Sequence, residues 1–93
     1  MLNKVKTALR INNNAYDEEI LGLINACKKE LELCGIVLSN LSADDEMITQ
    51  AIILYCKANF GFDNNEAQRF SESYNLLKAF LCTNQEYLKE KKA

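Results

Sequence analysis

The segment ITQAIILYCKANFGF, residues 48–62, decides how this chain folds because it is apolar on more than one side. At helical spacing, one line of apolar side chains comprises Ile48, Ile52 and Tyr55. A second flank, about 100° round the helix, comprises Ile53, Cys56 and Phe60. A helix that is apolar nearly all round is buried on more than one face, so we expect this one to lie between other parts of the fold.

Three roles suit so much apolar and aromatic surface: a core, a ligand pocket or a surface that meets another subunit. No convergent polar or titratable side chains accompany the aromatics of LYCKANFGF, 54–62, which argues against a pocket. Leu54 and Tyr55 are interpreted as domain core. Two interpretations stay open for Cys56 and Phe60: they pack under the connection 36–41, or they meet a neighbouring subunit.

Working outward, helical periodicity recurs on both sides of this segment. Helices are predicted over about 2–10, 16–34, 44–60 and 64–82, and a short fifth one over 84–91 is a candidate anchored by Tyr87 and Leu88. The second helix has a stripe spaced by four and three residues: Ile20, Ile24, Cys27, Leu31 and Cys34. The fourth has a similar stripe, which Leu76 and Phe80 are expected to widen. The chain has no proline and no strand pattern. We therefore predict an all-α, small four- to five-helix bundle.

Polar residues mark the expected helix ends. Asn13 or Asn14 is a candidate cap for the second helix, and Gly35 suits its end. Capping pairs are predicted before the third and fourth helices, from Ser42 with Asp45 and from Asp63 with Glu66. We expect one domain over residues 1–93, with 84–93 fraying.

Length and charge restrict the function. A chain of 93 residues buries only somewhat more than roughly 60% of its unfolded surface, so its core is thin. The net charge of −2 gives no overall attraction to nucleic acid or an anionic membrane. The first ten residues are nevertheless basic and could touch DNA phosphates without reading sequence, through Lys4, Lys6 and Arg10. No secretory h-region and no membrane-spanning run is visible.

The chemistry-bearing residues do not form a catalytic or metal-binding pattern. Histidine is absent, as are glycine-rich phosphate loops. Cys27 and Cys34 are spaced too widely for a paired zinc site, and about 10 Å of helix separates them, so they cannot bridge each other. With no export signal, Cys27, Cys34, Cys56 and Cys82 are interpreted as reduced thiols in the core. We predict no enzymatic activity, no cofactor and no metal.

Four pieces in this order carry a resemblance: VKTALRI, YDEEILGLINACKKELELCGI, ITQAIILYCKANFGF and RFSESYNLLKAFL. Together they resemble the small α-helical head–tail connector proteins of tailed bacteriophages and prophages, also called adaptor, head-completion or DNA-packaging proteins. The resemblance covers nearly the whole chain, and the order of the pieces is more specific than any one of them. It implies a structural subunit of a ring, typically a dodecamer, that docks on the portal, extends the DNA channel and joins head to tail.

The resemblance also implies the partners: the portal protein, a stopper or tail-completion protein, and further copies of the chain. DNA contact would be transient and non-specific, and no membrane is involved. Assembly is expected in the host bacterial cytoplasm, with the virion head–tail junction as the final location. Candidate interface residues are Ile53, Cys56, Phe60, Tyr87 and Leu88. The alternative is a small helical DNA-binding or regulatory protein.

Overall fold

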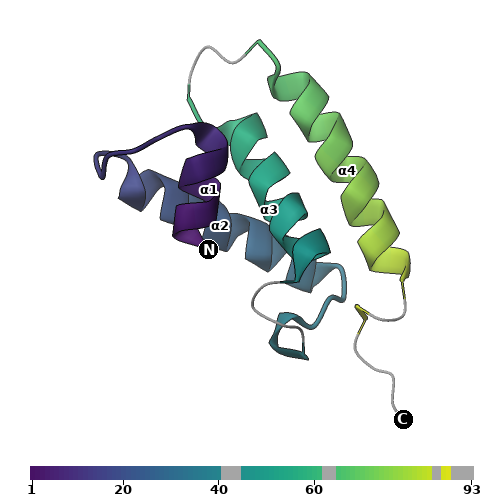
Figure 1. Cartoon of the computed structure of the whole chain (residues 1–93). Helices are drawn as coiled ribbons and strands as arrows, with labels where there is room; N and C mark the ends of the chain where they lie inside the picture. The colour runs from purple at the N-terminus through teal and green to yellow at the C-terminus, as the bar shows by residue number, and fades with distance from the viewer. Residues whose placement is uncertain (41–44, 62–64, 85–86, 89–93) are drawn as a thin grey trace.

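The structure is a computed structural model that describes residues 1–40, 45–61, 65–84 and 87–88. Its helices are α1 (Leu2–Leu9), α2 (Asp17–Leu33), α3 (Glu46–Asn59) and α4 (Ala67–Thr83), with a short 3₁₀ helix, η1 (Leu38–Asn40), before α3 (Figure 1). The all-α prediction and the four long helices are confirmed, with helix ends shifted by up to three residues. In the last candidate helix, the described residues Asn84, Tyr87 and Leu88 are not helical, so that prediction is wrong for them.

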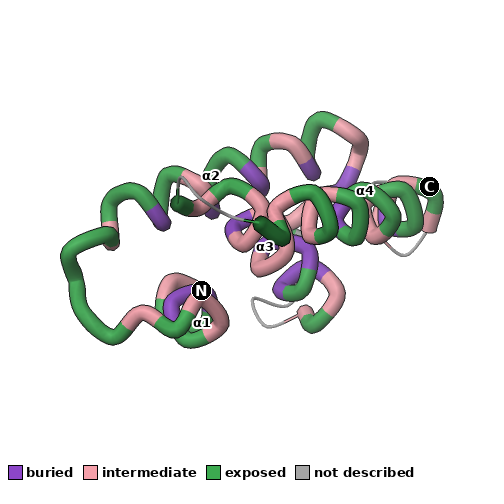
Figure 2. The backbone as a smooth tube through the Cα atoms, turned by 90° about the horizontal axis from the view of Figure 1, so that it is seen from above, coloured by how far each residue is buried: buried purple, intermediate pink, exposed green. Residues whose placement is uncertain are grey.

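Helix α3 is the centre of the fold, as its two apolar flanks predict. It packs against each of the other three helices, and α4 runs antiparallel along one side of it. Figure 2, seen from above, shows α1, α2 and α4 arranged around α3. The domain measures 45 × 24 × 18 Å and has a radius of gyration of 13.5 Å, against about 12 Å for a compact chain of this length. An elongated domain leaves much of each outer helix at the surface.

The core takes side chains from all four helices. Its centre on α3 is fully buried and consists of Ala51, Ile52 and Cys56. Around this centre lie the buried residues of the other elements: Val5, Ile20, Ile24, Cys27, Leu31, Ile36, Tyr74 and Leu81. The four-and-three stripe of α2 is therefore confirmed over its first four members, because the periodicity places them on the face that packs on α3.

The prediction that Gly35 ends α2 is confirmed, because it follows the C-cap residue with a φ of +108°, whereas the N-terminal caps differ from those predicted. Asp45 is the N-cap of α3, where its Oδ1 accepts a hydrogen bond of 3.0 Å from the Ile48 amide. Asn13 and Asn14 do not cap α2, since their side chains accept bonds from the Ala15 amide and from Lys6 instead. The predicted caps Ser42 and Asp63 lie outside the described residues. Glu66 is the N-cap residue of α4, without a side-chain bond to the helix amides.

The described C-terminal residues return to the connection that follows α2. The Val37 amide donates to the Tyr87 carbonyl over 3.1 Å, and Ile36 pairs with Leu88 in an isolated antiparallel bridge. Gly35 permits this close approach, because its φ is +108° and a Cβ there would lie 3.3 Å from Leu88 Cδ2. The segments 35–37 and 87–88 therefore hold each other in place.

Candidate assembly surfaces

The second flank of α3 is more covered than the sequence suggested. Cys56 is fully buried, so its assignment to a subunit interface is corrected: it belongs to the core. The reason is that α3 packs against all three of the other long helices, and this packing covers the Cys56 side chain. Ile53 is only partly buried and lines a shallow hollow of about 320 Å³ between α1 and α3, together with Lys4, Glu46, Thr49 and Gln50.

Phe60 packs against the entry to α2. Its ring meets the Tyr16 ring edge-on, with centroids 5.5 Å apart. The two rings and Ile11 form the apolar part of a hollow of about 370 Å³, whose rim includes Glu19 and Asn59. Polar groups do not converge in this hollow as a ligand site requires, and Phe60 keeps a partly exposed edge.

Tyr87 and Leu88, the remaining candidate interface residues, are partly buried against their own chain. The Tyr87 hydroxyl lies 3.2 Å from both carboxylate oxygens of Asp45, the N-cap of α3. Leu88 forms the bridge to Ile36. The structure thus gives both residues an intramolecular role and leaves part of each at the surface.

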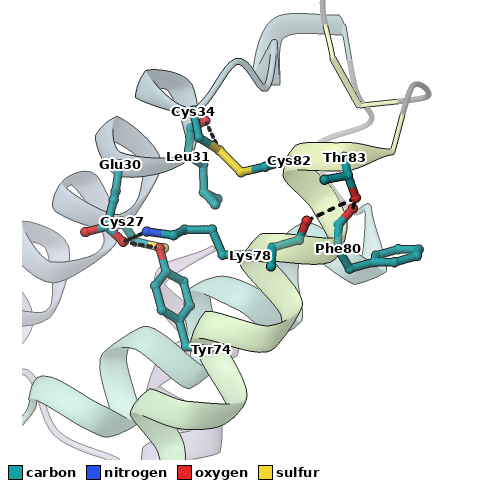
Figure 3. Close-up of a disulfide and its surroundings, with 10 residues drawn as sticks. Cys27, Glu30, Leu31, Cys34, Tyr74, Lys78, Phe80, Cys82 and Thr83 are labelled. Carbon is teal, nitrogen blue, oxygen red and sulfur yellow. Dashed lines mark hydrogen bonds and ion pairs between the residues drawn. A yellow bond between two sulfur atoms is a disulfide. The ribbon is translucent and has the colours of Figure 1, made fainter.

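An exposed apolar stripe on α4 was missed in the sequence. Leu76 and Phe80, called here the α4 outer stripe, are 74% and 49% exposed and lie one turn apart. Both were expected to widen the core-facing stripe, which is wrong. The helical period could have predicted their exposure, because Leu76 lies about 160° and Phe80 about 120° round the helix from buried Tyr74. Figure 3 shows Phe80 pointing away from the side on which Lys78 reaches α2.

The basic N-terminal residues do not form one surface. Lys6 is 9% exposed; its Nζ lies 2.8 Å from Asp17 and donates to Asn14 over 2.9 Å. Its charge is neutralised inside the domain, so we correct its assignment as a DNA contact. Lys4 and Arg10 are exposed on α1 and at its end, where Arg10 adopts a left-handed conformation with φ 63°.

A polar cluster links α2 to α4 (Figure 3). The Tyr74 hydroxyl donates to Glu30 over 2.5 Å, Lys78 approaches the same oxygen at 3.2 Å, and the Cys27 thiol lies 3.8 Å from the Tyr74 oxygen. The hydrogen bond from Tyr74 lowers the pKa of Glu30, while burial, followed by the bond to Glu30, raises the pKa of Tyr74. Both shifts move the pKa away from neutrality, so neither group is suited to proton transfer near neutral pH. The cluster instead links α2 to α4.

The cysteines divide into two pairs. Cys27 and Cys56 are free and fully buried, as predicted, and burial raises their pKa to about 11 and about 12. Cys34 and Cys82 instead form a disulfide, with Cα atoms 6.0 Å apart, so the interpretation of four reduced thiols is wrong. Cys34 sits at the end of α2 and Cys82 in the last turn of α4, which the fold brings together.

Neither a metal centre nor a membrane span is found in the part of the chain that the structure describes. There, His, Cys, Asp and Glu side chains do not gather in groups of three that could hold a metal ion. None of the described helices combines the length and hydropathy that crossing a bilayer requires.

Comparison with known proteins gives one family. A family model described as "Phage connector protein" matches residues 1–88. No curated protein and no solved structure gives a significant match. The match covers all four helices and the segment that returns to residues 35–37.

Proposed function

This chain belongs to the phage connector protein family, and we propose that it is a head–tail connector subunit that docks on the portal as a ring, extends the DNA channel and joins head to tail. Membership makes it a structural phage protein that works with other head and tail proteins. The ring, the portal contact and the channel are the proposed part. The family match over nearly the whole chain is the observation that carries it.

The surface of the domain supports an assembly role. Leu76 and Phe80 leave a large apolar side chain in water on each of two successive turns of α4, and contiguous exposed apolar surface commonly marks an interaction site. The proposed interface therefore includes this α4 outer stripe. Ile53, Phe60, Tyr87 and Leu88 stay in it as partly exposed residues, whereas Cys56 drops out.

Contact with packaged DNA is assigned to Lys4 and Arg10, which are exposed, and not to Lys6. Two cations on a chain of net charge −2 would give a weak, salt-sensitive, sequence-independent contact. A dedicated DNA-binding role gains no support from this arrangement, since the ion pair with Asp17 removes Lys6 from the basic face.

The test is assembly on the portal protein of the same phage or prophage. The purified chain is mixed with assembled portal, and the complex is measured by native mass spectrometry and imaged by electron microscopy. We expect a ring on one end of the portal. The variants Leu76→Ser and Phe80→Ser should fold normally and lose ring formation, whereas Leu33→Ser, which changes an exposed leucine at the end of α2, should assemble. A wild-type chain that never joins the portal or a tail complex contradicts the proposal.

A further inference from the structure

The Cys34–Cys82 disulfide lies at the base of a small structure formed by the segment after α2 and the segment after α4. Cys34 directly precedes the segment 35–37, and Cys82 precedes the described residues Asn84, Tyr87 and Leu88 by a few positions. Among the described residues, these segments are also joined by the antiparallel Ile36–Leu88 bridge, which includes the hydrogen bond from the Val37 amide to the Tyr87 carbonyl. The disulfide therefore lies where the two segments meet.

This small structure is also tied to the core through the Tyr87 hydroxyl, which lies 3.2 Å from both carboxylate oxygens of Asp45, but most of its described members are partly exposed. Only Ile36 among its members is fully buried, while Val37, Tyr87 and Leu88 are partly exposed. Helix α4 itself packs mainly on α3, and its polar tie to Glu30 lies one to two turns before Cys82. Regions with few buried contacts open at low free energy, so a covalent link here restricts local motion more than it would in the core.

The disulfide is also the cysteine pair that a small thiol can reach. Cys34 and Cys82 are partly exposed, whereas Cys27 and Cys56 are fully buried. Thiol exchange requires a thiolate and access to sulfur, and burial denies both to the two free cysteines, whose pKa it raises. Scrambling with the buried thiols is thereby suppressed, and exchange is confined to one bond.

We infer that the Cys34–Cys82 disulfide is a redox-sensitive latch that low-molecular-weight thiols open and low-molecular-weight disulfides close. To open it, a thiolate attacks one sulfur and forms a mixed disulfide, and the other sulfur leaves as a thiolate. A second thiol then releases the attacking one as its disulfide, so two small thiols are oxidised and the protein gains two thiols. Closing is the reverse exchange. The opened latch frees Tyr87 and Leu88 from the segment 35–37.

The latch itself is inferred from the geometry of the disulfide. When it opens and closes during assembly rests on the proposed function. A reducing host cytoplasm would keep it open during assembly, and oxidising surroundings would close it in the released particle. The segment after α2 and the C-terminal segment would then adjust to neighbouring subunits before being fixed.

The experiment measures amide hydrogen exchange in the 93-residue chain by NMR, in buffer with either oxidised or reduced glutathione. In the reduced protein we expect exchange at the Val37 and Tyr87 amides to speed up by about tenfold or more, while central amides of α2 and α3 keep their rates. Cys82→Ser should show the fast rate in both buffers. Cys27→Ala should keep the redox response and is the matched cysteine control.

Three other results would each contradict the proposed latch. Four titratable thiols after unfolding in oxidised glutathione would mean that the bond does not form. Equal rates in both buffers would mean that it restricts nothing locally. Uniform acceleration of all helices would make it a support of the whole fold. None of these results depends on portal binding, so failure here is distinguishable from failure of the proposed function.

Discussion

The hydroxyl of Tyr74 on α4 donates a hydrogen bond of 2.5 Å to the carboxylate of Glu30 on α2, across 44 residues of sequence. Tyr74 is 4% exposed, and its ring also packs edge-on against Tyr55, with centroids 5.3 Å apart. One side chain therefore ties three helices together, through a polar tip toward α2 and an apolar ring toward α3.

Removing the hydroxyl of Tyr74 should lower stability without disturbing the packing. We expect Tyr74→Phe to reduce the free energy of unfolding by about 1 kcal/mol, the usual net value of one hydrogen bond. Urea unfolding followed by circular dichroism measures it. Tyr55→Phe, which alters a neighbouring ring, should cost less. Equal losses in the two variants would contradict the role given to the bond with Glu30.

The same bond predicts an acid dependence of stability. The pKa of Glu30 is lowered in the folded chain from its ordinary 4.5, so the unfolded chain takes up the proton first as the pH falls. The stabilisation is present above about pH 4.5 and is lost as the pH falls through the folded value. We expect the stability difference between wild type and Glu30→Gln to be largest near neutrality and to shrink below about pH 4.5. A difference that stays constant with pH would contradict this.

Thiol titration should separate the two cysteine pairs. In the native oxidised protein we expect no rapid labelling, because Cys27 and Cys56 are buried and Cys34 is bonded to Cys82. Unfolding should release two thiols, and unfolding with a reductant should release four. Mass spectrometry after alkylation gives the counts. Rapid labelling of Cys27 or Cys56 in the native protein would contradict the core packing.

Replacing Lys6 should lower the free energy of unfolding more than replacing Lys4, although both are lysines on α1. We expect Lys6→Ala to cost about 1–3 kcal/mol of unfolding free energy, because it leaves a partly buried carboxylate at Asp17 without its cation. Lys4→Ala, at an exposed position, should change stability by less than about 0.5 kcal/mol. Thermal and urea unfolding compare them directly, and similar losses would show that the Lys6–Asp17 pair contributes no more than surface charge.

Phe60 and Phe80 should differ in how much each contributes to stability. Phe60→Ser removes a ring that packs on Tyr16 and the core, so we expect a loss of about 1–3 kcal/mol. Phe80→Ser changes a half-exposed ring and should cost less than about 1 kcal/mol. Urea midpoints of the two proteins give the comparison. A Phe80→Ser chain that unfolds as readily as Phe60→Ser would show that the α4 outer stripe supports the fold.

Much of the fold follows from local periodicity. Spacing by three and four residues places Ile20, Ile24, Cys27 and Leu31 on one face, because a helix repeats every 3.6 residues whatever surrounds it. The same period predicts that Leu76 and Phe80 are exposed, because it places both far round the helix from Tyr74. Counting apolar residues on α4 without their angles does not show this. The order of the helical pieces was enough to indicate the family.

Other features needed the tertiary structure. The sequence could exclude a bond between Cys27 and Cys34, since their distance along one helix is fixed, but it could not pair Cys34 with Cys82. That pairing depends on how α2 and α4 lie around α3. Likewise, α1 reads as a basic helix in the sequence, and only its packing beside Asp17 shows that Lys6 is neutralised. By itself the sequence determined which helices form and which faces are apolar, because these depend on neighbours in the chain. Which cysteines meet, which lysine is buried and which apolar faces stay in water were decided by contacts between residues far apart in it.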